Sequence, residues 1–230
     1  EEVSRRLRAR ELLMGEVNAA AEGAFAAGAK RVVAVQGHGS SFIYERADPR
    51  LELITGSQYA EWIPDISSGF AGAFVVGAHA RFGTPGATLA HTFSFEQGRR
   101  WQLCGREIGE FGAFAAICGA HGVPVIMASG DDKFCAEARD LLPDIETAQV
   151  KTGISLHCAR HLSKERACAT IRTAARHAVE KLARSKPGLY ELPGPTYEFR
   201  ISAYQPFAPI LRPGVSLKPI SATEVELHGP

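Results

Sequence analysis

The sequence predicts an α/β fold with a mostly parallel sheet, flanking helices and a smaller C-terminal α+β region. Three observations predict it. Helical segments of 3.6-residue periodicity alternate with short apolar runs. Two of those runs, in residues 31–37 and 73–77, are rich in β-branched residues and end in glycine, as buried strands do. After Pro187 prolines become frequent and short alternating segments replace the long helices.

The helices and strands are predicted from periodicity and from start and stop signals. Helices are expected over residues 1–27, 107–120, 134–142 and 163–184, and strands over 31–35, 51–55, 73–76, 123–128, 147–151, 196–201 and 224–227. Gly28 supplies a stop for the first helix, and Ser163 is a good N-cap for the last one. Residues 91–103 alternate around Gln97-Gly98 and predict a β-hairpin.

These elements divide the chain into two parts. We expect an α/β core with a metal site over residues 1–150, including the hairpin at 91–103, and a smaller α+β domain over residues 151–230. Folds of this class usually begin with a strand, whereas this sequence begins in a charged helix. We therefore expect that the first strand is absent from the given sequence.

Composition excludes several classes of protein. Hydrophobic residues make up 45% and charged residues 22% of the 230, and the net charge of +1 gives no electrostatic basis for binding nucleic acid or a membrane surface. No apolar stretch reaches the roughly 18 residues of a membrane span, and no signal peptide opens the sequence. Five cysteines without a CxxC pair predict reduced, mostly buried thiols and a cytoplasmic protein.

Polar groups follow a glycine at the ends of three predicted strands. These segments are Gln36-Gly37-His38, Gly77-Ala78-His79 and Gly130-Asp131-Asp132. If the strands are parallel neighbours, the polar groups line one edge of the sheet, where open α/β folds bind ligands. Imidazole and carboxylate are the usual ligands of zinc. A single histidine is more often a hydrogen-bonded structural residue, but two at equivalent places favour a metal site.

Other interpretations compete for some of these residues. The sequence contains no GxSxG elbow, P-loop, dinucleotide fingerprint or HExxH pair. His157 and His161 would share a face if helical, but an exposed pair is the better interpretation. Glu110 falls near a helix N-terminus, where the helix dipole favours a carboxylate. For Asp131 and Asp132, capping of the following helix is favoured over a metal role.

An ordered set of short motifs resembles a known family. The motifs are Met14-Gly15-Glu16-Val17-Asn18-Ala19-Ala20, Gly23-Ala24-Phe25, the His38 turn, Gly77-Ala78-His79-Ala80-Arg81 with Thr84-Pro85-Gly86, His91, Ile108-Gly109-Glu110 and the segment VPVIMASGDD at 123–132. In this order they resemble the zinc-dependent D-aminopeptidases named after the bacterial dipeptide-transport operon. The resemblance covers most of residues 10–185, and the tail after Pro187 matches only loosely.

The resemblance implies a hydrolase that removes an N-terminal D-amino acid from small peptides such as D-Ala-D-Ala. It implies two zinc ions, with His38 as a ligand of one, His79 and Glu110 as ligands of the other, and His91 as the catalytic histidine. It also implies a homo-oligomer, in the form of a decameric ring. The family's Asp-x-Glu-Gly motif of the first strand is not in this sequence, so fewer ions are expected if those ligands are truly absent.

Two alternatives stay open beside this expectation. One is a non-catalytic relative that keeps the fold with an incomplete metal site. The other is a metal hydrolase of a different peptide or amide. The spacing of residues does not predict a substrate-binding pocket, and Lys151 receives no role.

Overall fold

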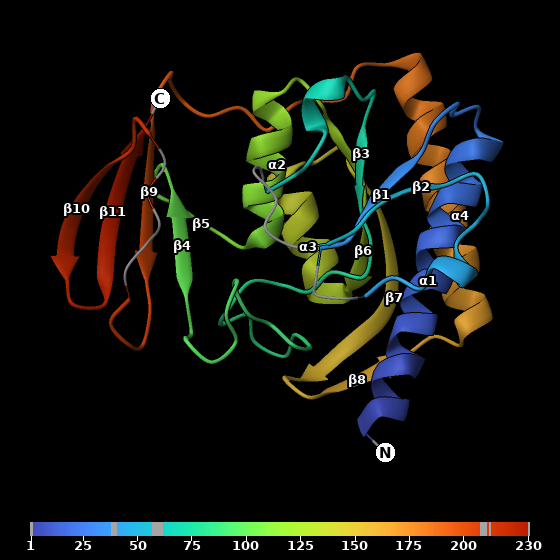
Figure 1. Cartoon of the computed structure of the whole chain (residues 1–230), viewed down its shortest axis with the longest axis horizontal. Helices are drawn as coiled ribbons and strands as arrows, with labels where there is room; N and C mark the ends of the chain where they lie inside the picture. The colour runs from blue at the N-terminus through green and yellow to red at the C-terminus, as the bar shows by residue number, and fades with distance from the viewer. Residues whose placement is uncertain (1, 38–40, 57–61, 208–210, 212, 230) are drawn as a thin grey trace.

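The computed structural model describes residues 2–37, 41–56, 62–207, 211 and 213–229 (Figure 1). The helices are α1 (Glu2–Ala26), α2 (Glu110–Ala120), α3 (Asp132–Leu141) and α4 (Lys164–Arg184), with 3-10 turns η1 (Tyr44–Arg46) and η2 (Ile66–Ser68). The strands are β1 (Val33–Val35), β2 (Glu52–Ile54), β3 (Ala73–Val75), β4 (Arg100–Leu103), β5 (Arg106–Ile108), β6 (Val125–Asp131), β7 (Glu146–Ser155), β8 (Cys158–His161), β9 (Tyr197–Ser202), β10 (Ser216–Ser221) and β11 (Glu224–Gly229).

The central sheet has the strand order β3-β6-β7-β8. Strands β3, β6 and β7 are parallel, and β8 returns antiparallel to β7. A separate parallel pair joins β1 to β2. Strand β6 is buried along its whole length, since it is central and covered on both faces. The predicted α/β class with a mostly parallel sheet and flanking helices is confirmed.

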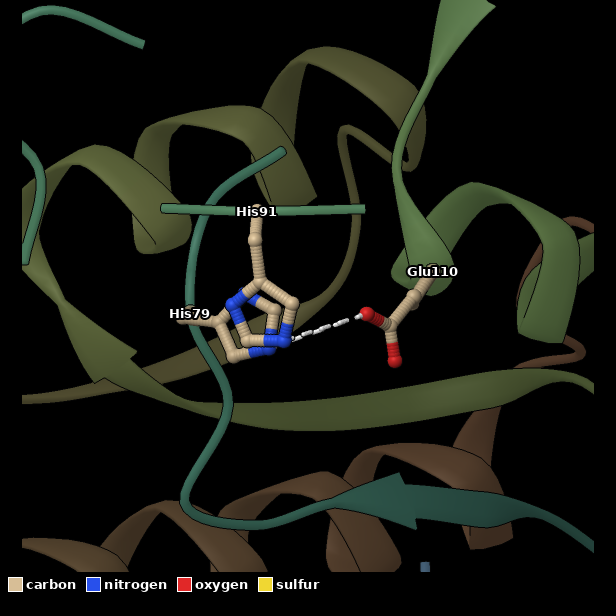
Figure 2. Close-up of side chains that lie close together, drawn as sticks. All are labelled: His79, His91 and Glu110. Carbon is tan, nitrogen blue, oxygen red and sulfur yellow. Dashed lines mark ion pairs between the residues drawn. The ribbon is translucent and has the colours of Figure 1, made fainter. Parts of the chain in front are cut away.

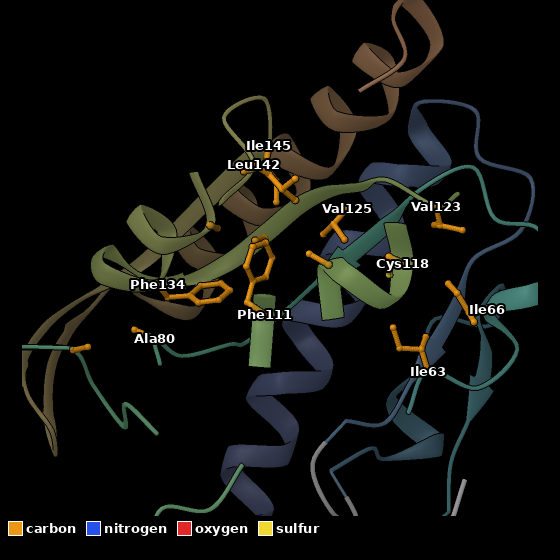
Figure 3. Close-up of a cluster of buried hydrophobic side chains, with 14 of the residues drawn as sticks. Ile63, Ile66, Ala80, Phe111, Cys118, Val123, Val125, Phe134, Leu142 and Ile145 are labelled. Atoms are coloured by element: carbon orange, nitrogen blue, oxygen red, sulfur yellow. The ribbon is translucent and has the colours of Figure 1, made fainter. Parts of the chain in front are cut away.

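Helices cover both faces of the central sheet (Figure 1). Helices α1 and α4 pack on one face, in a core with Ile126, Met127 and Ile171. Helices α2 and α3 pack on the other face, where Phe111 and Phe134 meet edge to face with ring centroids 5.5 Å apart (Figure 3). Strand β6 runs directly into α3, and Asp131 and Glu137 contact the loop that follows β3, so this layer positions the candidate site.

The predicted helix start and stop signals are confirmed for α1, α3 and α4. Gly28 adopts a positive φ of 99° after α1, a conformation that glycine takes without strain. The side chain of Ser163 accepts a hydrogen bond from Arg166 N at the start of α4. The side chain of Asp131 does the same for Phe134 N at the start of α3. Capping by Asp131, which sequence favoured over a metal role, is therefore confirmed.

A second sheet stands beside the α/β core. Its order is β10-β11-β9-β4-β5, and every pairing in it is antiparallel. Helix α2 lies between the two sheets, and its Ala113 and Ala116 pack on the second sheet beside Trp101. A side chain at Gly119 would collide with the Tyr190 carbonyl. The alanine- and glycine-rich composition of α2 thus allows close packing on two sides.

The hairpin predicted over residues 91–103 is wrong. The observed hairpin is β4–β5, with its turn at Cys104-Gly105. Both turn residues have positive φ, 50° and 79°, as a tight two-residue hairpin turn requires. Residues 91–99 form a loop before β4. Strand β5 also takes the residues before Gly109, so α2 begins at Glu110 and not at residue 107.

The division of the chain at residue 150 remains a prediction. The boundary falls inside β7, and α4, from the second predicted part, packs against α1 in the same core. None of the helices in the described part of the chain combines the length and apolar character that crossing a membrane requires.

Candidate metal centre

Three predicted site residues come together beyond the carboxyl end of β3. His79 follows β3 by a short turn, His91 lies on the long loop after it, and Glu110 is the first residue of α2 (Figure 2). One ligand atom from each side chain lies within 4.8 Å of those of the other two. All three side chains are largely buried, with 13%, 17% and 22% exposure for His79, His91 and Glu110. The fourth predicted residue, His38, lies outside the described residues.

The two imidazoles face the same carboxylate oxygen. His79 Nε2 and His91 Nε2 each lie 3.8 Å from Glu110 Oε1. The rings stack with centroids 3.9 Å apart and planes inclined by 22°, as their overlap in Figure 2 shows. This arrangement differs from a hydrogen-bonded ion pair, because 3.8 Å is too long for an N–H···O bond.

Backbone carbonyls set the orientation of both rings. His79 Nδ1 lies 3.1 Å from the Ala80 carbonyl oxygen, and His91 Nδ1 lies 2.7 Å from that of Leu89. A carbonyl oxygen only accepts, so each Nδ1 must carry the proton that it donates. The lone pair of the neutral ring is then on Nε2, which is the atom that faces Glu110. Metal-binding histidines are held by backbone carbonyls in this way.

Glu110 is oriented from the loop that carries His91. Phe93 N donates a hydrogen bond of 2.8 Å to Glu110 Oε1. Glu110 also begins α2, where the dipole of the helix favours its negative charge. The interpretation of Glu110 as a helix-terminal carboxylate and its place in the cluster are therefore compatible.

The His91 loop is held in an unusual backbone conformation. Leu89 and Phe93, on either side of His91, have positive φ values of 53° and 62°. A residue other than glycine is disfavoured in this left-handed conformation by about 1–2 kcal/mol. Such strain persists only where the surroundings hold it, and it is common at functional sites. Sequence alone gave no signal of it, because neither residue is a glycine or asparagine.

The donor set fits zinc. Zinc takes imidazole nitrogen and carboxylate oxygen at about 2.0–2.2 Å, so one ion fits between a nitrogen and an oxygen about 4 Å apart, and each Nε2 lies 3.8 Å from Glu110 Oε1. His79, His91 and Glu110 could hold it through Nε2, Nε2 and Oε1. A zinc structural site is usually closed by four protein ligands, whereas three leave a position for water or substrate.

The other candidates lie outside this cluster. His157 and His161 are exposed and belong to the β7–β8 hairpin, so they do not share a helix face. Burial raises the pKa of Cys118 to about 12 and that of Cys135 to about 11, so neither is a thiolate at neutral pH. The expectation of mostly buried thiols holds for these two, but Cys158 is exposed.

Comparison with known proteins shows the family of this chain. A profile of the D-aminopeptidase family matches residues 2–208. The chain belongs to the D-aminopeptidase family. A D-aminopeptidase of Bacillus subtilis (strain 168) is 31% identical over 183 residues, which cover 78% of this chain and 66% of that protein, slightly less than two thirds.

A solved structure of this family shares the fold. It is the zinc-dependent D-aminopeptidase DppA of Bacillus subtilis, described as a self-compartmentalizing protease. The TM-score is 0.83 with 26% sequence identity, over 96% of this chain and 81% of that one. The family resemblance inferred from the ordered motifs is therefore confirmed.

Proposed function

We propose that this chain is a zinc-dependent D-aminopeptidase. In this proposal it hydrolyses the amide bond after an N-terminal D-amino acid in short peptides such as D-Ala-D-Ala. The observation that carries it is the cluster of His79, His91 and Glu110, whose ligand atoms lie within 4.8 Å of one another. Family membership and the zinc dependence of the structural relative support the same conclusion.

In the proposed site, His79 and Glu110 hold one zinc ion of a dinuclear pair, and His38 contributes to the other. Bound zinc supplies Lewis-acid activation of the amide carbonyl and of water. Glu110 is suited to its role because Phe93 N fixes the orientation of Oε1. His79 is suited because its Nδ1 contact with the Ala80 carbonyl directs Nε2 toward Glu110.

His91 is proposed as the catalytic histidine. With Nδ1 donating to the Leu89 carbonyl, its Nε2 can accept a proton from the attacking water. The same atom then returns the proton to the leaving amine as the C–N bond breaks. The protonated ring also stabilises the negative charge that develops on the carbonyl oxygen. The equal distances of both histidines from Glu110 allow His91 to be a ligand instead, so its role needs a separate test.

The proposal also includes a cytoplasmic homo-oligomer in the form of a decameric ring. The relative's description as self-compartmentalizing supports the assembly. Five free cysteines support a reducing compartment. Light scattering of the full-length protein should give a mass several times that of one chain. A monomeric mass at micromolar concentration would contradict the ring.

The activity is tested with the purified full-length protein and a peptide panel. We expect bound zinc, and zinc-stimulated release of D-alanine from D-Ala-D-Ala, with L-Ala-L-Ala cleaved much more slowly. Cleavage of L-peptides or simple amides at equal or higher rates would favour a metal hydrolase of another substrate. Absence of both zinc and hydrolysis would favour a non-catalytic relative.

A further inference from the structure

The loop between the two histidines has little regular structure to fix its shape. It leaves the sheet after β3 and makes short turns, such as Thr84 N to the Arg81 carbonyl at 3.3 Å, and one bond joins its two ends, from Phe82 N to Thr92 Oγ1 at 3.1 Å. The two imidazoles nevertheless stack at 3.9 Å. Two carboxylates at α3 hold the same two ends from outside the loop, by accepting hydrogen bonds from Arg81 N and Thr88 N.

Glu137 holds the loop at its first end. Its Oε2 accepts a hydrogen bond of 2.9 Å from Arg81 N, just after His79, and lies 3.6 Å from Arg81 Nη1. The Glu137 side chain is only 10% exposed, and burial raises its pKa despite the hydrogen bonds from Arg81. Burying a carboxylate is costly unless hydrogen bonds compensate. A surface glutamate elsewhere on α3 would avoid that cost.

The same carboxylate lies against the start of α2. A Cβ atom built at Gly109 would be 2.9 Å from Glu137 Oε1 and 2.7 Å from Arg81 Cβ. Gly109 directly precedes Glu110, and its missing side chain lets its backbone pack closely against Arg81 and Glu137. Glu137 thus contacts the segments of two predicted ligands.

Asp131 holds the loop at its second end. It is fully buried, and its Oδ1 accepts a hydrogen bond of 2.7 Å from Phe134 N as the cap of α3. Its other oxygen, Oδ2, accepts a hydrogen bond of 2.8 Å from Thr88 N, shortly before His91. Thr88 Oγ1 donates to the Cys158 carbonyl at 2.9 Å, which ties the same point to β8. Helix capping uses only one oxygen of Asp131, so the second has a separate role.

We propose that Asp131 and Glu137 are positioning residues that clamp the two ends of the His79–His91 loop to α3 and so set the geometry of the metal centre. The inference rests on the proposed metal site. Metal ligands tolerate displacements of only about 0.2 Å, and loss of a group that orients a ligand typically weakens metal binding about 10- to 100-fold. Both carboxylates act through backbone N–H groups of the loop.

The Glu137 half of the clamp is tested with a conservative and a disruptive variant of the full-length protein. Glu137→Gln keeps an oxygen that accepts from Arg81 N, so we expect cobalt(II) affinity within about threefold of wild type. Glu137→Met fills the same space without an acceptor, and we expect affinity at least about tenfold weaker with a changed cobalt absorption spectrum. Glu107→Met is the matched control, because Glu107 lies 3.9 Å from Arg81 Nε without contacting the Arg81 backbone.

The Asp131 half is tested with Asp131→Asn. Asparagine caps helices as well as aspartate does, but its NH₂ group would face Thr88 N–H or Phe134 N–H in place of the second oxygen. Because Thr88 lies at the His91 end of the loop, we expect kcat for D-Ala-D-Ala lower by about tenfold with cobalt affinity near wild type, and faster amide exchange at Thr88 in the metal-free protein. Ser163→Ala is the control. It removes the cap of α4, and should lower thermal stability without changing kcat or cobalt affinity.

The outcomes separate the clamp from the metal site itself. If wild type binds cobalt, and Glu137→Met binds it with unchanged affinity and spectrum while Asp131→Asn keeps the wild-type kcat, the clamp is overturned. If wild type binds neither cobalt nor zinc, the proposed function fails. The clamp is then judged by amide exchange alone. Faster exchange at Arg81 in Glu137→Met and at Thr88 in Asp131→Asn supports it, and unchanged exchange overturns it.

Discussion

Two glutamates of this protein, Glu110 and Glu226, are each surrounded by nitrogen groups, yet the two surroundings differ. Glu226 lies in the antiparallel sheet, is 3% exposed, and accepts hydrogen bonds from Arg200 and from Lys218 Nζ at 3.1 Å. His228 Nε2 lies 3.0 Å from the same carboxylate. Glu110 instead faces two imidazoles at 3.8 Å.

The difference lies in what can neutralise each carboxylate. Arginine and lysine are permanent cations in direct contact, so Glu226 is compensated within the chain, and its role is structural. The histidines beside Glu110 present Nε2 lone pairs at a spacing that suits a metal ion between them. The Glu110 cluster differs from the Glu226 cluster in two ways that indicate a metal site. Its nitrogens are electron-pair donors in the neutral rings, and its nitrogen–oxygen distances exceed those of hydrogen bonds.

The largest contrast is expected from replacing each glutamate by glutamine. Glu110→Gln removes a charged ligand. Loss of a group that only supports a ligand weakens metal binding by up to about 100-fold, so we expect zinc affinity at least about 100-fold weaker and D-Ala-D-Ala hydrolysis near background. Glu226→Gln should leave both within about twofold and lower only the Tm. Zinc titration and peptide assays measure the pair. Equal losses of activity in both variants would remove the distinction.

The two histidines of the cluster can be separated in the same way. His91→Ala should lower kcat by about 10²- to 10⁴-fold, as loss of a general base does, while zinc content stays near wild type. His79→Ala should lose zinc. His228→Ala, from the Glu226 cluster, is the control and should change neither quantity. Loss of zinc in His91→Ala would make His91 a ligand and contradict its proposed catalytic role.

Removal of metal should lower the Tm of the protein only where the Glu110 cluster is intact. A ligand at 100 times its Kd stabilises a protein by about 2.7 kcal/mol, which raises the Tm of a chain of this size by about 5–10 °C. We expect a chelator to lower the Tm of wild type and of Glu226→Gln by that amount, and not that of Glu110→Gln. Calorimetry with and without chelator measures it. A chelator effect as large in Glu110→Gln as in wild type would place the metal elsewhere, whereas a smaller one would come from the second ion of the proposed pair.

The smallest effect is a pH dependence that belongs to Glu226. Hydrogen bonds from Arg200, Lys218 and His228, in that order of importance, lower its pKa from 4.5 to about 2. Because the pKa is lower in the folded state, the stabilisation is complete above the ordinary value and is lost as pH falls from 4.5 to about 2. The Tm difference between wild type and Glu226→Gln should therefore be constant near pH 6–7 and shrink over that range. A difference that does not vary with pH would contradict the assignment.

Sequence predicted the α/β core well because its signals are local. Glycine after an apolar run, Ser163 before α4 and Asp131 before α3 each act within a few residues of the element that they end or begin. The hairpin was misplaced because Cys104 adopts a positive φ that its residue type does not predict, whereas Gln97-Gly98 looked like a turn. Strand β10 was missed, since its Pro219 and its position at the sheet edge weaken any strand pattern.

For the candidate site, the sequence predicts which residues belong to it but not the contacts that orient them. His79, His91 and Glu110 were expected at one place, and the structure brings them together, although their roles remain predictions. The contacts that orient them were not predictable. The Ala80 and Leu89 carbonyls, and Glu137, reach the site through loop geometry and long-range packing, for which the sequence carries no periodic or spacing signal.

The central claim is that one zinc ion binds between His79, His91 and Glu110, with His79 and Glu110 as ligands. Anomalous diffraction at the zinc edge from crystals of the zinc-loaded full-length protein tests it most directly. We expect a peak about 2.0–2.2 Å from His79 Nε2 and Glu110 Oε1, and no peak at the Glu226 cluster. A zinc-loaded crystal without density at that position, or with its zinc bound elsewhere, would contradict the account.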